Sequence, residues 1–181
     1  PAEIEHLFKG RREWEEHYRH RFQFSPERIL KAHVRVNDKM VPFDQGGRAF
    51  LQADQRDYIY GLHCGSLFGQ IRDFIGVENC SYLYIDDEPL FDEIIETVGE
   101  LSYQCAKFAL ESGAKFDFAH FWEDICFKNG PLIAPGAFRQ KIGPHYRRIT
   151  ELLERYNIDI VSVDCDGCID ALVPIWLENG V

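Results

Sequence analysis

Two carboxylates stand two residues apart near the end of an apolar run. In a strand, successive side chains alternate between the two faces, so Ser162, Asp164 and Asp166 share one face. Oxygens grouped at the end of a strand can bind cationic or N–H groups of a substrate, and we expect this role chiefly of Asp164. The alternative is that the acids cap the helix expected from Ile169, chiefly through Asp166.

A second group of polar residues, which includes His120, Trp122 and Glu123, ends the preceding run. A carboxylate beside an imidazole can hold a proton, a metal or a cationic intermediate, and a neighbouring indole raises the pKa of a carboxylate. If the strand is regular, His120 and Glu123 lie on opposite faces, so only one of them enters a site. The alternative is a solvated or helix-capping acid and a hydrogen-bonded histidine.

Two further motifs carry weaker signals. Cys165 and Cys168 have the spacing of a zinc half-site or a redox pair, but Cys64 and Cys126 are isolated in the sequence and offer no second half-site. Nearby aspartates would also raise a thiol pKa, so we interpret the spacing as coincidental and predict neither metal nor cofactor. The glycine-bearing turn before Ser66 could present helix N–H groups to an anionic part of a substrate.

Alternating strands and helices must position these residues. Strands are predicted at Tyr58–Cys64, Phe116–Phe121 and Asp159–Asp164. Four helices are predicted. A short helix ends at Gly76, a long helix runs from Asp86 to Gly113, and two more cover Pro135–Tyr156 and Ile169–Glu178. This order predicts βαβ units and a parallel sheet in sequential order with right-handed crossovers, so the polar strand ends lie on one edge.

The number of strands suggests part of a larger architecture. A closed (β/α)₈ barrel takes about 250 residues, so three convincing parallel strands with crossover helices favour an α/β fold of the partial (β/α)₈, or TIM barrel, type. We assign the barrel part to residues 57–181 and an N-terminal helical arm and loop to residues 1–56. Two open strand edges and an apolar inner face predict self-association, so we expect a homo-oligomer.

The first 56 residues are predicted to form an arm outside the core. Trp14, Tyr18 and Arg21 recur at helical spacing, and Ser25-Pro26 is typical of a helix start. Residues 36–57 show little periodicity and predict a loop.

Composition limits the function classes. The chain has 181 residues, of which 45% are hydrophobic and 28% charged, as in one soluble globular domain. A net charge of -10 argues against nucleic acid and anionic membranes as partners. Six scattered cysteines predict reduced thiols and a cytoplasmic location, and we find neither a leader nor a membrane-spanning run. The chain stops just past the last expected helix, at Asn179-Gly180-Val181, so we expect a cut C-terminus.

Several segments together resemble the central part of the uroporphyrinogen decarboxylase family, which also contains corrinoid methyltransferases. The segments are Asp117–Asp124, Pro131–Pro135 with Phe138, Pro144–Ile149, Asp164–Gly167 and Trp176–Val181. The most specific is Gly130-Pro-Leu-Ile-Ala-Pro135 with its following helix. Family members are (β/α)₈ barrels of well over 300 residues, so the resemblance, best over residues 57–181, implies a middle piece.

The sequence departs from the family's motifs at positions that matter for function. The Arg-rich N-terminal motif of the decarboxylases has no counterpart, and Asp164 and Asp166 stand where the methyltransferases carry zinc ligands. Glu123 falls about where decarboxylases carry an acid in the barrel mouth.

The resemblance thus implies a fragment of an enzyme for tetrapyrrole decarboxylation or related methyl transfer, inactive alone, acting on a small molecule. Asp164 would bind substrate, Glu123 or His120 would move protons, and Asp166, Ser66 and Trp122 would contribute to substrate binding. Two alternatives stay open: a non-catalytic truncated relative that works through self-association, and a metal-dependent lyase or hydrolase.

Overall fold

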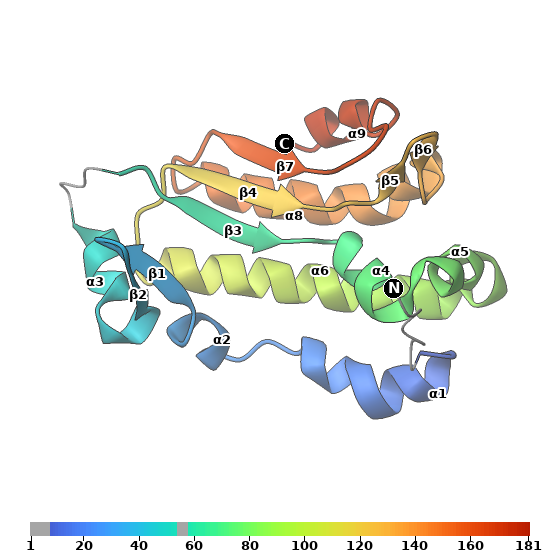
Figure 1. The fold of residues 1–181 in the computed structure, drawn as a ribbon, viewed down its shortest axis with the longest axis horizontal. Coiled ribbons are helices and arrows are strands. Elements are labelled where there is room, and N and C mark those ends of the chain that lie inside the picture. The colour runs from blue at the N-terminus through green and yellow to red at the C-terminus, as the bar shows by residue number, and fades with distance from the viewer. Residues whose placement is uncertain (1–7, 54–57) are drawn as a thin grey trace.

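A three-stranded parallel sheet lies at the centre of the computed structural model, which describes residues 8–53 and 58–181. Its strands are β3 (Gly61–Gly65), β4 (Phe118–Trp122) and β7 (Val161–Asp164), paired in the order β3-β4-β7 with both pairs parallel. All three run in the same direction in Figure 1, so their carboxyl ends meet at one edge. The predicted parallel, sequential order is confirmed.

Helices connect the strands, and the longest of them runs beneath the sheet in Figure 1. They are α4 (Gly69–Ile75), α5 (Val77–Asp86), α6 (Glu88–Glu111), α7 (Pro135–Ala137), α8 (Gly143–Glu154) and α9 (Val173–Glu178). The side chain of Asp87 accepts a hydrogen bond from Leu90 N and so begins α6 where the sequence predicts. Helix α5 was not predicted, and none of the helices in the described residues is long and apolar enough to cross a membrane.

Two helix predictions need correction. The helix expected over Pro135–Tyr156 is divided into α7, a π-helical turn at Phe138–Ile142 and α8, because Pro144 has no N–H to continue the α-helical pattern. The helix expected from Ile169 begins only at Val173 and has no side-chain cap, so Asp166 does not cap it. A two-stranded hairpin, β5 (Cys126–Phe127) with β6 (Gly130–Pro131), follows β4.

The loop predicted over residues 36–57 is wrong in its described part. Strands β1 (His33–Val36) and β2 (Lys39–Pro42) form an antiparallel hairpin, and a 3₁₀ turn (Phe43–Gln45) and α3 (Gly47–Gln52) follow it. The connecting residues Asn37 and Asp38 both have positive φ, as a type I′ turn requires. Two strands of four residues carry too little periodicity for the pattern to reveal them. The end of the predicted loop, at 54–57, lies outside the described residues.

Short helices and helical turns occupy much of residues 11–30, and their apolar side chains belong to the main core. The elements are α1 (Arg11–Glu13), a π-helical turn (Trp14–Tyr18), a 3₁₀ turn (Arg19–Phe22) and α2 (Glu27–Leu30). The Trp14 side chain is 0% exposed, packs on Phe22 and Phe74, and donates its indole N–H to Glu93 in α6 at 3.0 Å. The expected boundary between residues 56 and 57 lies outside the described residues, and the main core contains residues from both sides of it.

Because Trp14 joins the arm to α6, we predict that Trp14→Ala lowers the free energy of unfolding by about 3–5 kcal/mol. Tyr82→Ala, at a ring that is largely exposed on α5, should change it by less than about 0.5 kcal/mol. Urea unfolding followed by circular dichroism measures both values. An equally small effect at Trp14 would mean that the arm does not stabilise the fold.

Candidate active site

A row of polar side chains crosses the sheet at one level. His63 in β3 is paired in register with His120 in β4, and His120 is paired with Ser162 in β7. Strand alternation places their neighbours Leu62 and Phe121 in the core. The three polar residues therefore share the face of the sheet that the core does not use.

Each histidine uses its Nδ1 in a hydrogen bond. His120 Nδ1 lies 2.9 Å from Ser162 Oγ, which also lies 3.4 Å from the Ala119 carbonyl oxygen. His63 Nδ1 instead accepts from Gly65 N at 3.1 Å, so neutral His63 carries its proton on Nε2. The row thus places the Nε2–H donor of His63 beside the ring of His120, with ring centroids 6.0 Å apart.

The environment favours the neutral form of His63. Partial burial lowers its pKa, and the positive charge that His120 can carry lowers it further. His63 therefore acts as an N–H donor at neutral pH.

A pocket opens beside this row. Its volume is about 490 Å³, and it lies between the β1–β2 hairpin and β3, with His63 in its wall. Apolar side chains such as Phe43 and Leu51 form most of the lining, and His33 and Arg35 add polar groups. A largely apolar pocket of this size with a few polar groups is typical of small-molecule sites.

The predicted site residues His120, Trp122 and Asp164 do come together on this face. Trp122 is paired in register with Asp164, one level nearer the carboxyl edge than the histidines. Asp164 is exposed and Trp122 half-buried. Asp166 is exposed beyond the strand end, where its backbone N–H donates to Asp124 Oδ1 at 3.2 Å.

Glu123 lies on the opposite side, as the alternation predicts, and it is fully buried. Its carboxylate accepts hydrogen bonds from five groups: Ser66 Oγ at 3.0 Å, the backbone N–H groups of Leu67 (2.9 Å), Phe68 (2.9 Å) and Gly69 (2.6 Å), and the Tyr146 hydroxyl. Burial raises the pKa of Glu123, and these hydrogen bonds oppose the rise. Every donor comes from the protein itself, so this carboxylate positions the β3–α4 turn.

Ser66 belongs to the same buried network. Its hydroxyl donates to Glu123 and accepts from Gln70 N at 2.9 Å, and the side chain is buried. The turn N–H groups that could have held an anionic substrate are thus occupied by Glu123. A Cβ at Gly69 would lie 1.9 Å from the Glu123 carbonyl oxygen, so only glycine permits this approach.

His63 was not among the predicted site residues, although it alternates with the buried residues Leu62 and Cys64 and pairs with His120. Cys126 was predicted to be isolated, whereas it lies close to Cys165. Among residues 8–53 and 58–181, no three His, Cys, Asp or Glu side chains are arranged to hold a metal ion.

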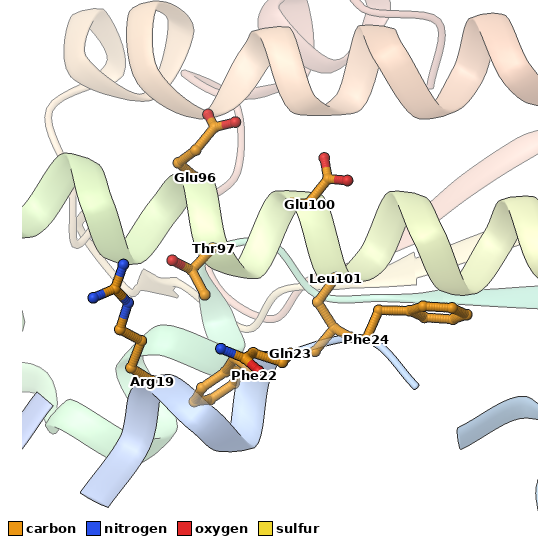
Figure 2. A pocket seen from close by; sticks show the side chains of 8 residues that line it. All are labelled: Arg19, Phe22, Gln23, Phe24, Glu96, Thr97, Glu100 and Leu101. Carbon is orange, nitrogen blue, oxygen red and sulfur yellow. The ribbon is translucent and has the colours of Figure 1, made fainter. Parts of the chain in front are cut away.

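A second pocket, of about 420 Å³, lies away from this face, between the arm and α6 (Figure 2). Arg19, Phe22, Gln23 and Phe24 line it from the arm, and Glu96, Thr97, Glu100 and Leu101 line it from α6. It contains none of the predicted site residues.

Comparison with known proteins identifies one similar fold. No family model and no curated protein match the sequence. Among solved structures, a methyltransferase from Methanosarcina mazei is similar, with a TM-score of 0.52 and 16% identity over 74% of this chain. The match covers 37% of that methyltransferase, so this chain spans only part of its length. At this identity the likeness shows a shared α/β fold.

The two acids Glu123 and Asp164 should behave differently on truncation. Glu123→Ala leaves five buried donors without a partner, and we predict a loss of about 3–5 kcal/mol in the free energy of unfolding. Asp164→Ala removes an exposed carboxylate and should cost less than about 0.5 kcal/mol. Chemical denaturation measures both, and similar losses at the two positions would contradict the assignment.

His63 should titrate below the usual histidine pKa of about 6.5. Because this folded-state pKa is lowered, the stability that His63 contributes is present above about pH 6.5 and is lost as the pH falls through the folded-state pKa. His120→Gln should raise the pKa of His63, since it removes the neighbouring positive charge. NMR titration of the ring protons measures this shift, and an unchanged pKa in the variant would show that the two rings do not interact.

Proposed function

We propose that this chain carries part of the substrate site of a methyl-transferring enzyme, built on three consecutive strands of a (β/α)₈ barrel related to the uroporphyrinogen decarboxylase family. The observation that carries the proposal is the pair of neighbouring histidines in register across β3 and β4, of which His63 lines an apolar pocket. In this proposal His120 carries its proton on Nδ1, directed at Ser162 Oγ, so that its Nε2 is the basic nitrogen. The parallel order β3-β4-β7 and the similarity in fold to a methyltransferase support it. The substrate is a small molecule that carries a methyl group on oxygen, nitrogen or sulphur.

The histidine pair fits the proton movements of methyl transfer. When a methyl group leaves an oxygen or nitrogen for an accepting X–H group, the acceptor loses a proton and the leaving atom gains one. In this proposal His120 Nε2 takes the proton from the acceptor and passes it on to the leaving atom, while His63 Nε2–H stabilises the leaving atom by a hydrogen bond. The base and the hydrogen-bond donor then lie side by side, with ring centroids 6.0 Å apart.

The other predicted site residues contribute to this proposed site in different ways, some by binding substrate and some by positioning the chain. Asp164 binds cationic or N–H groups of the substrate from the carboxyl edge, and Trp122 provides an apolar surface next to it. Asp166 reaches the same edge. Glu123 and Ser66 are positioning residues, because their polar atoms are occupied within the buried turn.

Binding of two probes tests this function without requiring turnover. Methylcobalamin carries a transferable methyl group on the cobalt of a corrin ring and represents the methylated product of transfer from an O-, N- or S-methyl substrate to a corrinoid. Uroporphyrin carries the carboxylates of a decarboxylase substrate. We expect methylcobalamin to shift the His63 and His120 ring signals in NMR spectra. We also expect His120→Gln to weaken that binding about tenfold, which corresponds to roughly 1.4 kcal/mol.

His20→Gln, at an exposed histidine of the arm, is the matched control and should leave binding unchanged. Shifts at the histidine row by uroporphyrin alone would move the assignment to a decarboxylase. If neither probe affects these rings, the proposed site is wrong.

We further propose that copies of the chain associate through the open face and edges of the sheet. Strands β3 and β7 end the sheet, and Ile160, next to β7, is 66% exposed. Exposed apolar side chains beside an unpaired strand favour pairing with a second chain. Light scattering at tens of micromolar should give at least a dimer mass, and a uniform monomer would refute the association.

A further inference from the structure

Three cysteines from two segments that are distant in sequence lie near one another at the carboxyl edge of the sheet. Cys126 lies in β5, whereas Cys165 and Cys168 belong to residues 165–168, the cysteine loop, which follows β7. All three thiols are free. Cys165 and Cys168 are both close enough to Cys126 to raise the pKa of its thiol.

Backbone contacts hold the cysteine loop against β5. Cys168 N donates to the Phe127 carbonyl at 2.9 Å. Gly167 has a φ of +91°, and a Cβ at this position would lie 2.3 Å from the Cys126 carbonyl oxygen. Only a glycine allows the loop to approach so closely, so the meeting of the three cysteines is built into the backbone.

The three thiols differ in their access to solvent. Cys168 is exposed, Cys165 is intermediate and Cys126 is buried. Burial together with the two neighbouring cysteines raises the pKa of Cys126 to about 12, so Cys126 is a protonated thiol at neutral pH. A reagent from solution therefore meets Cys168 first and Cys126 last.

We propose that Cys126, Cys165 and Cys168 form a thiol–disulfide exchange site that reacts with small organic disulfides and ends as a Cys126–Cys165 disulfide. This site is separate from the methyl-transfer chemistry proposed above and does not depend on it.

The exchange balances over three steps. The Cys168 thiolate attacks the small disulfide RSSR, which forms Cys168–S–S–R and releases one RS⁻. Cys165 then attacks the Cys168 sulphur, forms a Cys165–Cys168 disulfide and releases the second RS⁻. Finally Cys126 attacks the Cys165 sulphur, Cys168 leaves as a thiolate, and the proton of Cys126 passes to it. In total, two protein thiols and RSSR give one protein disulfide and two RSH.

The high pKa of Cys126 determines which of the three exchange steps is slowest. A protonated thiol attacks slowly, so the last step limits the rate and accelerates as the pH rises. The product would join β5 to the segment that follows β7. Asp124 and Asp166 lie in the same region and already share a hydrogen bond, so the disulfide would fix the edge of the sheet that carries Asp164.

The test uses the folded full chain and oxidised glutathione. After acid quenching and alkylation of the remaining thiols, peptide mapping by mass spectrometry should show a Cys126–Cys165 cross-link with Cys168 alkylated. Cys168→Ser should slow the formation of this cross-link at least about tenfold and leave its identity unchanged. Cys165→Ser should abolish it, and Cys105→Ser, at a partly buried thiol on α6, should have no effect.

Circular dichroism of each variant shows whether it is folded, so that loss of the cross-link can be distinguished from loss of the fold. The main test is the cross-link formed in the wild-type chain. A final product that contains only glutathionylated Cys168, or a stable Cys165–Cys168 disulfide, would overturn the proposal. Stoichiometric zinc that protects the three thiols from alkylation would overturn it as well. Because the readout is a cross-link, its failure leaves the tests of the methyl-transfer proposal unaffected.

Discussion

The buried carboxylate of Glu123 holds together three parts of the chain that are distant in sequence. Glu123 follows directly after β4. Its carboxylate accepts hydrogen bonds from Ser66 and three backbone N–H groups of the turn between β3 and α4, and from Tyr146 of α8. A buried charge is tolerated only when donors surround it, so the turn and the helix must keep their places. The ends of β3 and β4 are thereby fixed relative to each other, and with them the register that sets His63 beside His120.

Strand alternation explains how much of the site the sequence could predict. Because side chains alternate, the pattern around His120 and Glu123 shows that the two residues face opposite sides, and the structure confirms it. The same rule places Ser162 and Asp164 on one face. The pattern does not show which face is filled by hydrogen-bond donors, because four of the five donors to Glu123 come from a turn 54–57 residues earlier in the chain and the fifth, Tyr146, comes from α8.

Contacts between segments that are distant in sequence account for the other places where the structure differs from the sequence-based predictions. The Trp14 side chain is buried by Phe74 and bonded to Glu93, and neither contact leaves a local signal near residue 14. Cys126 meets Cys165 because the hairpin after β4 folds against the loop after β7, across 39 positions. The β1–β2 hairpin depends on two positive φ values at Asn37 and Asp38, which the polar pair permits but does not require.

The central claim is that His63 and His120 present a donor and a basic nitrogen on one face, and the tautomers of the two rings test it most directly. Long-range ¹H–¹⁵N correlation spectra of the ¹⁵N-labelled chain near pH 8 distinguish the protonated from the unprotonated ring nitrogen. We predict the proton on Nε2 in His63, whose Nδ1 accepts from Gly65 N, and on Nδ1 in His120, as the proposed function requires. The same tautomer in both rings would contradict it.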